Sequence, residues 1–222
     1  MGKNVDSDVW ERLWTGIREL SEHYDNQLVF IGGVAVYLHV KAHELTKGFV
    51  ERSHDGDFYI SIQDYSALRD AEELTINRRL DKHQVSKYGV EFDVYVENQN
   101  SLLVKYVDMA AESVVIDEVR VACLEHLLLL KLDAYNNRRG SAKGRKDERD
   151  LIRIVYLLHR EGVKQKRLLP YLTEKRVELL TLVQRSSAFN DITEDNFHES
   201  RKLRDVFEKT AKSVAKTLDR RR

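Results

Sequence analysis

The sequence from Arg52 to Ile60 reads Arg-Ser-His-Asp-Gly-Asp-Phe-Tyr-Ile, and this stretch decides how the whole chain is interpreted. In an extended strand successive side chains point to opposite faces. Asp55 and Asp57 therefore share one face, while Phe58 lies on the other. Two neighbouring carboxylates repel each other, which favours a cation between them. The stretch predicts a strand with one apolar, buried face and one face suited to a cation.

A glycine pair, Gly32 and Gly33, follows a short apolar segment at Leu28–Ile31. We expect this segment to be a strand and the glycines to lead into a helix. Backbone N–H groups at such a turn, together with the positive end of the helix, suit a phosphate group. The glycines also suit a simple turn, so the phosphate interpretation depends on the aspartates. Ser53 lies two residues before Asp55, and its hydroxyl suits either a phosphate oxygen or an ordinary polar edge.

A second acidic strand is predicted at Tyr88–Val96, because apolar and polar residues alternate there with a period of two. If this strand pairs beside the first with the apolar rows aligned, Asp93 joins Asp55 and Asp57 on one face. Three carboxylates on an open face can bind two divalent ions for an in-line phosphoryl displacement. The alternative is that all three are ordinary solvent-facing acids.

The composition is that of a soluble protein with no overall charge bias. Of the 222 residues, 42% are hydrophobic, and Lys plus Arg equals Asp plus Glu at 37 each. Zero net charge gives no general attraction to nucleic acid or to a membrane, so any such attraction must be local. The single cysteine, Cys123, excludes an intramolecular disulfide and a thiolate zinc site. We find no signal peptide and no membrane-spanning stretch, and expect a cytoplasmic protein with no membrane partner.

The expected fold class is α+β, with a mixed sheet and helices in residues 1–122 and an all-α second domain in residues 123–222. The other elements expected in the first domain are a helix at Asp8–Tyr24, a helix beginning near Asp64, connecting chain at Asp81–Lys87, a strand at Val104–Val107, and strands within Ser113–Val121 around a turn at Asp117–Glu118. Those expected in the second domain are an apolar helix around Leu127–Leu132, a basic connection at Arg138–Arg149, and helices at Leu151–Leu158, Arg167–Val183 and Phe197–Leu218.

Lys131 is a charged residue on an apolar helix, with Leu127 and Leu128 one turn earlier. A buried ammonium must reach water or meet an anion, and the two candidate anions are a nucleotide phosphate and a structural carboxylate. Asp147 and Asp150 share a face near the start of the next helix. They are either helix-start acids or partners of Lys131 or of an attacking hydroxyl.

Together these motifs resemble the polymerase-β-like nucleotidyltransferase superfamily, and within it the AbiEii-type toxins and their minimal relatives. The resemblance extends from Leu28 to Leu158. Its elements are the strand–Gly-Gly–helix, the Ser-x-Asp-x-Asp strand, the lone aspartate of the next strand, Leu-Leu-x-x-Lys-x-x-Ala from Leu127, and Arg-Lys-Asp-x-x-Asp from Arg145. The chain departs from the family in having Gly56 between the aspartates, where an aliphatic residue is usual, and Gly-Gly instead of Gly-Ser.

The resemblance implies a metal-dependent enzyme that transfers a nucleoside monophosphate from an ATP- or GTP-like NTP to an acceptor hydroxyl. The implied roles are metal binding (Mg²⁺ or Mn²⁺) for Asp55, Asp57 and Asp93, triphosphate binding for Gly32, Gly33 and Ser53, and lining of the nucleotide site for Lys131, Asp147 and Asp150. If the chain is the toxin of a toxin–antitoxin pair, an antitoxin protein is an implied partner. The acceptor is an RNA (such as tRNA), a protein or a small molecule, and the basic segments Arg138–Arg149 and Arg201–Arg222 favour RNA. The alternatives are a non-catalytic nucleotide- or nucleic-acid-binding module of the same fold, and a helical interaction scaffold.

Overall fold

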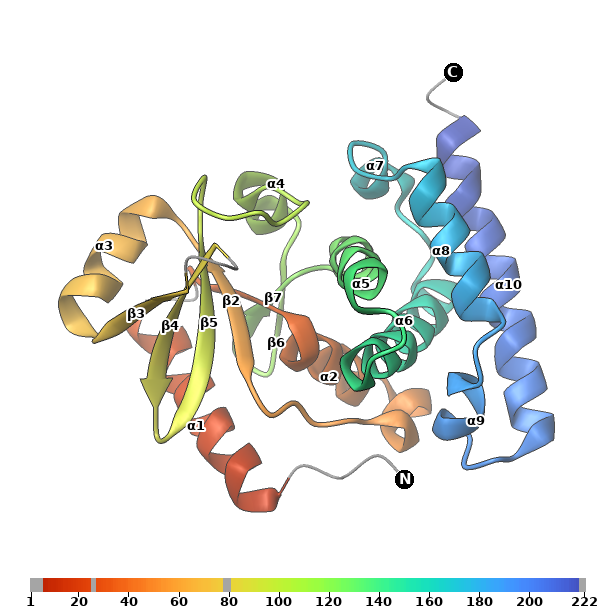
Figure 1. Cartoon of the computed structure of the whole chain (residues 1–222), viewed down its shortest axis with the longest axis horizontal. Helices are drawn as coiled ribbons and strands as arrows, with labels where there is room; N and C mark the ends of the chain where they lie inside the picture. The colour runs from red at the N-terminus through yellow and green to blue at the C-terminus, as the bar shows by residue number, and fades with distance from the viewer. Residues whose placement is uncertain (1–5, 25–26, 78–80, 220–222) are drawn as a thin grey trace. The chain divides into compact units, whose positions relative to one another are not determined.

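The structure is a computed structural model that describes residues 6–24, 27–77 and 81–219 (Figure 1). The chain divides into two compact units. The sheet unit comprises Lys3–Leu45 and Val50–Cys123, and the helical unit contains Thr46–Phe49 and Leu124–Arg222. The α+β fold class is confirmed, with a mixed sheet in the first half of the chain and helices in the second.

A mixed sheet forms the centre of the sheet unit, and its strand order in the described residues is β3-β4-β5-β2-β1-β7-β6. The central strand β2 lies parallel to β5 and antiparallel to β1. The strands are β1 (Val29–Ile31), β2 (Gly56–Ile60), β3 (Leu74–Asn77), β4 (Lys82–Lys87), β5 (Val90–Val96), β6 (Val114–Ile116) and β7 (Val119–Val121). The turn predicted at Asp117–Glu118 joins β6 to β7, and both of its residues have positive φ.

The helices of the sheet unit are α1 (Ser7–His23), α2 (Gly32–Ala42), α3 (Ile62–Ala71) and α4 (Tyr106–Ala111). A 3₁₀ helix, η1 (Glu44–Phe49), follows α2, and its residues Thr46–Phe49 belong to the helical unit. Helix α1 begins where the carboxylate of Asp6 accepts a hydrogen bond from the backbone N–H of Asp8. Leu13, Ile17 and Leu20 of α1 are buried. This helix therefore contributes its apolar face to the core of the unit.

The ring of Phe92 packs where the sheet meets α1, and two glycines make room for it. A Cβ atom at Gly56 would lie 2.4 Å from Cδ1 of Phe92, and one at Gly16 of α1 would lie 2.8 Å from its Cζ. Phe92 is completely buried. The glycine between the two aspartates, which departs from the resembled family, therefore has a packing reason in this chain.

Two segments of the sheet unit differ from the sequence-based expectation. The connecting chain expected at Asp81–Lys87 is wrong, because Lys82–Lys87 is strand β4, paired with β3 and β5. Its single buried apolar residue, Val85, gives too weak a pattern for a prediction, and the pairing on both sides supplies the stability. The strand expected at Val104–Val107 is also wrong, because α4 begins at Tyr106; a four-residue apolar run does not distinguish a strand from a helix end.

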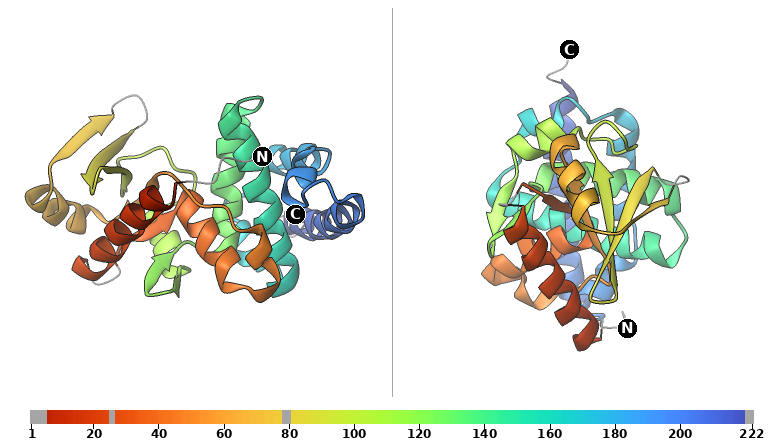
Figure 2. Two further views of the ribbon diagram at one scale, coloured as in Figure 1. Left: turned by 90° about the horizontal axis from the view of Figure 1, so that it is seen from below. Right: turned by 90° about the vertical axis from the view of Figure 1, so that its left-hand side faces the viewer.

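The helical unit contains α5 (Leu124–Arg138), α6 (Ala142–Glu161), α7 (Gln165–Leu168), α8 (Glu174–Gln184), α9 (Ala188–Ile192) and α10 (Phe197–Asp219). Figure 1 and Figure 2 show α5 beside α6 and the long α10 beside α8. No helix in the described ranges has the length and apolar character needed to cross a bilayer.

Two expected boundaries in the helical unit are wrong. The basic connection expected at Arg138–Arg149 is short, because α6 begins at Ala142, where Ser141 accepts a hydrogen bond from the N–H of Gly144 at 3.0 Å. The single helix expected at Arg167–Val183 is two helices, α7 and α8. Pro170 lies in the turn between them, because proline cannot continue a helix.

A buried cluster of charged side chains joins α5 to α6. The Lys131 ammonium lies 2.7 Å from Oδ2 of Asp150 and 3.4 Å from Oδ1 of Asp147. Arg138 also pairs with Asp147, and Arg153 with Asp150. Of the two kinds of anion considered for Lys131, the structure pairs it with structural carboxylates, those of Asp147 and Asp150.

We expect Gly56→Ala to lower the free energy of unfolding by about 1–3 kcal/mol, because the new methyl group overlaps the buried ring of Phe92. Urea unfolding measures this loss. Gly48→Ala is the control, because a Cβ there meets nothing within 4 Å. The double variant Gly56→Ala/Phe92→Leu should recover part of the loss, and equal stability of wild type and Gly56→Ala would contradict the packing argument.

We expect Lys131→Met to lower the free energy of unfolding by about 3–5 kcal/mol, because it leaves two buried carboxylates with less positive charge. Lys212→Met is the matched control in the same unit, since Lys212 pairs with Glu208 on the surface of α10 and such pairs contribute under about 1 kcal/mol. Urea midpoints of the two variants measure the difference. Similar losses in both would exclude a structural role for the Lys131 pairs.

Candidate functional site

The structure brings Asp57 and Asp93 together. They are register partners on the parallel strands β2 and β5, which places both side chains on one face of the sheet. Neighbouring strands lie about 4.8 Å apart, so the two carboxylates are side by side. Burial along β5 alternates: Phe92 and Val94 are buried, whereas Glu91 is exposed and Asp93 is half-buried. The predicted strand adjacency of the two aspartates is therefore confirmed.

Gly32 places the start of α2 against the carboxylate of Asp57. A Cβ atom at Gly32 would lie 2.1 Å from Oδ2 of Asp57. Gly32 also has a φ of +64°, a backbone angle that residues other than glycine rarely adopt. Ile31, the preceding residue, is the register partner of Asp57 across β1 and β2. Glycine is thus required here both by the backbone and by the space that Asp57 fills. Gly33 is the next residue of α2 and is buried.

The prediction that Asp55 shares a strand face with Asp57 is wrong, because β2 begins at Gly56, and Ser53 and Asp55 precede it. Asp55 is exposed, and the buried hydroxyl of Ser53 donates a hydrogen bond to its Oδ1 at 3.1 Å. The structure therefore gives Ser53 a contact that orients Asp55. The strand ends at Ile60: Ser61 caps α3, and Ile62 is exposed at the start of that helix.

Asp93 has two partners that the sequence did not predict. The ammonium of Lys82 contacts its Oδ2, and the amide of Gln84 donates to its Oδ1 at 2.9 Å. His83, the residue between Lys82 and Gln84 in the sequence, points to the other face of the sheet, where it is hydrogen-bonded to Tyr65 at 3.0 Å. Burial lowers the pKa of its imidazole below the usual value. Lys82 is therefore the cation that β4 brings to Asp93.

A hairpin signal would have revealed these partners. Tyr88 and Gly89, both with positive φ, form a two-residue turn between β4 and β5. A two-residue loop containing glycine favours a hairpin, and a strand running back from it across β5 places Gln84 opposite Asp93. The polar composition of Lys82–Lys87 concealed this strand.

The fit of a divalent cation differs between Asp55 and Asp57 on the one hand and Asp93 on the other. Carboxylate oxygens are the ligands that Mg²⁺ and Mn²⁺ prefer. Asp55 is exposed, and Asp57 is half-buried with its carboxylate in the space that Gly32 leaves, so both suit such an ion. Asp93 suits it less, because both of its oxygens already accept hydrogen bonds. In the described part of the chain, no three His, Cys, Asp or Glu side chains gather closely enough to hold a metal.

Lys131, Asp147 and Asp150 lie in the helical unit, where they pair with one another as described above. Lys131 and the two aspartates are buried. These ion pairs give the three residues a structural role, which is to join α5 to α6. Their role in lining a nucleotide site stays a prediction.

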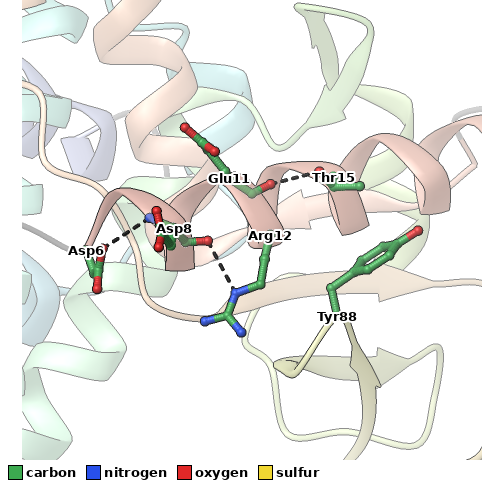
Figure 3. Close-up of a pocket in the computed structure, with 6 residues that line it drawn as sticks. All are labelled: Asp6, Asp8, Glu11, Arg12, Thr15 and Tyr88. Atoms are coloured by element: carbon green, nitrogen blue, oxygen red, sulfur yellow. Dashed lines mark hydrogen bonds between the residues drawn. The ribbon is translucent and has the colours of Figure 1, made fainter.

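A shallow pocket of about 590 Å³ lies beside the N-terminal turns of α1. Figure 3 shows its lining residues, which are Asp6, Asp8, Glu11, Arg12, Thr15 and Tyr88. Arg12 donates to the backbone oxygen of Asp8 at 3.3 Å, and Thr15 to that of Glu11 at 2.9 Å. None of the site residues predicted from the sequence lines this pocket.

Comparison with solved structures identifies the fold. A nucleotidyltransferase-like antigenic protein from Paracoccidioides brasiliensis is 17% identical with a TM-score of 0.51, and the match covers 83% of this chain and 93% of that one. JHP933 from Helicobacter pylori is 15% identical with a TM-score of 0.48, over 98% and 96% of the two chains. The polyadenylate synthase of Megavirus is 12% identical with a TM-score of 0.48, over 68% of this chain and 32% of that chain.

No protein-family model and no curated protein sequence matches the chain. The narrower resemblance to AbiEii-type toxins therefore stays a prediction. The structural likeness to the Paracoccidioides protein spans most of both chains. This chain has the nucleotidyltransferase-like fold.

Proposed function

We propose that the chain is a metal-dependent nucleotidyltransferase that moves a nucleoside monophosphate from an NTP to an acceptor hydroxyl and releases pyrophosphate. One observation carries this proposal: Asp57 and Asp93 lie in register on neighbouring strands, with the glycine start of α2 against Asp57. This arrangement occurs in a nucleotidyltransferase-like fold. It combines oxygen ligands for a cation with backbone donors for a phosphate.

Asp55 and Asp57 would hold Mg²⁺ or Mn²⁺, which when bound neutralises negative charge on the phosphates. Ser53 would keep Asp55 oriented through its hydrogen bond. The N–H groups at Gly32 and Gly33 would bind the triphosphate at the positive end of α2. The family resemblance implies metal binding for Asp93 as well, but its contacts with Lys82 and Gln84 oppose that role, so the proposed metal site is Asp55 and Asp57.

A non-catalytic nucleotide-binding module is the second candidate, and one contact favours it. Asp93 is already paired with Lys82 and Gln84, so the third carboxylate of the resembled catalytic set has partners of its own. Such a module would bind an NTP without transferring its nucleotide. The transfer assay below separates the two functions.

An RNA acceptor, such as tRNA, has support from the basic residues between Arg138 and Arg149. Of the basic residues there, Arg138, Arg145 and Arg149 pair with acids, whereas Arg139 and Lys143 are exposed. The segment thus offers less positive charge to RNA than its sequence indicates. A protein acceptor and the role of toxin with an antitoxin partner rest on the family resemblance. Arg220–Arg222, which add to the basic C-terminal end, lie outside the described residues.

We expect Asp57→Asn to reduce label transfer from each α-³²P-NTP by about a hundredfold or more, because it removes a carboxylate that would bind the metal. The assay uses Mg²⁺ or Mn²⁺ with separate RNA and protein fractions as acceptors. Asp70→Asn, a change at an exposed position on α3, is the control. Transfer that persists in Asp57→Asn and in excess EDTA would exclude the proposed metal-dependent reaction. NTP binding without any transfer would favour the non-catalytic module.

If RNA is the acceptor, transfer should fall with salt in proportion to the phosphate contacts made. Two contacts, from Arg139 and Lys143, predict a log–log slope of roughly −1.4, since each contact to a single strand contributes about −0.7. Arg139→Gln/Lys143→Gln should flatten the slope by that amount. Lys202→Gln on α10, whose lysine pairs with Glu199 on the surface, is the control. A flat response in wild type would exclude an RNA acceptor.

A further inference from the structure

We infer that Lys82 is the resident cation of Asp93: with Gln84 it occupies both carboxylate oxygens and keeps a divalent ion from binding there. The inference deepens the proposed function and rests on its metal site at Asp55 and Asp57. It assigns to Lys82 the control of how many metal ions the acidic row can hold. The row would then bind one divalent ion where three free carboxylates would bind two.

The geometry of β4 builds this contact. Gln84 is the register partner of Asp93 across the antiparallel strands β4 and β5. Lys82 lies two residues away on β4 and therefore points to the same face as Gln84. The Lys82 ammonium contacts Oδ2 of Asp93, and the Gln84 amide donates to Oδ1 at 2.9 Å. Each oxygen of Asp93 thus has a donor from the same neighbouring strand.

Partial burial strengthens the pair. The side chains of Lys82 and Asp93 are 12% and 13% exposed, so salt and water screen them less than a surface pair. A divalent ion at Asp93 would have to displace an ammonium and an amide, and would then face the ammonium at short range. Like charges at that distance repel, which opposes metal binding at this carboxylate.

Asp55, which the proposed metal site uses, has a different kind of contact. Asp55 is exposed, and its described partner is the neutral hydroxyl of Ser53. A divalent ion approaching Asp55 and Asp57 does not have to displace this hydroxyl, because the second oxygen of Asp55 can serve as the ligand. Asp55 thus keeps an oxygen for a metal ion, whereas both oxygens of Asp93 already have donors.

Mn²⁺ titration followed by electron paramagnetic resonance of the free ion tests this division in wild type, Lys82→Met, Asp93→Asn and the double variant. Wild type should bind one Mn²⁺, and Asp93→Asn should change its Kd less than about threefold. Lys82→Met should bind Mn²⁺ at least about tenfold more tightly or bind a second ion, and Asp93→Asn should abolish that gain. Lys87→Met is the control, because Lys87 lies on the same strand but pairs with Glu19 and Glu72.

Urea unfolding without metal provides the second measurement. Lys82→Met and Lys82→Gln should both be less stable than wild type, and adding Asp93→Asn should restore stability by removing the uncompensated carboxylate. Additive effects of the two changes would overturn the resident ion pair. Lys82→Gln also serves in the metal titration if Lys82→Met does not fold.

The failures of the inference and of the proposed function are distinguishable. If Asp93→Asn weakens Mn²⁺ binding equally in wild type and in Lys82→Met, Lys82 does not exclude metal, and the inference fails while the metal site stands. If Asp57→Asn leaves Mn²⁺ binding unchanged, or no variant binds Mn²⁺, the metal site of the proposed function fails. In the last case the inference fails as well, because freeing Asp93 created no metal site.

Discussion

Two carboxylates held side by side on neighbouring strands, Asp57 and Asp93, are the constraint on which the rest of the sheet unit depends. Their register is fixed by the pairing of β2 with β5, so neither can turn away from the other's face. The surroundings of the two carboxylates differ. Asp57 has the glycine start of α2 against its oxygen, and Asp93 has an ammonium and an amide from β4.

The opposite face of the same strands explains why this arrangement is stable. Phe92 and Gly56 alternate with the aspartates and therefore lie on the other side, where the ring fills the space that the glycine leaves. Lys87 of β4 also reaches α1, where it pairs with Glu19 at 2.5 Å and holds the pKa of that carboxyl below its usual value. One face is thus closed by packing, and the register of that packing fixes the acidic row on the other.

The helical unit meets a similar electrostatic problem deeper in the protein. Asp147 and Asp150 are buried, and Lys131, Arg138 and Arg153 supply the positive charge between α5 and α6. Water screens this cluster little, so the loss of one partner is costly there. The sheet unit differs, because Asp55 is exposed to solvent and the Lys82–Asp93 pair is only partly buried.

The sequence by itself determined the alternating strand β5, the glycine turn at Gly32 and the α+β class, because these follow from local patterns. The shared face of Asp57 and Asp93 was expected only if the two strands pair, and the register of β2 with β5 meets that condition. Tertiary structure decided the rest. Strand β4 exists because it pairs with β3 and β5, and its polar residues gave no periodic signal. The partners of Asp93 and Lys131 depend on which elements pack together. Sequence could state that each charge needs a partner, whereas the fold alone decided that Lys82 meets Asp93 and that Lys131 meets Asp147 and Asp150.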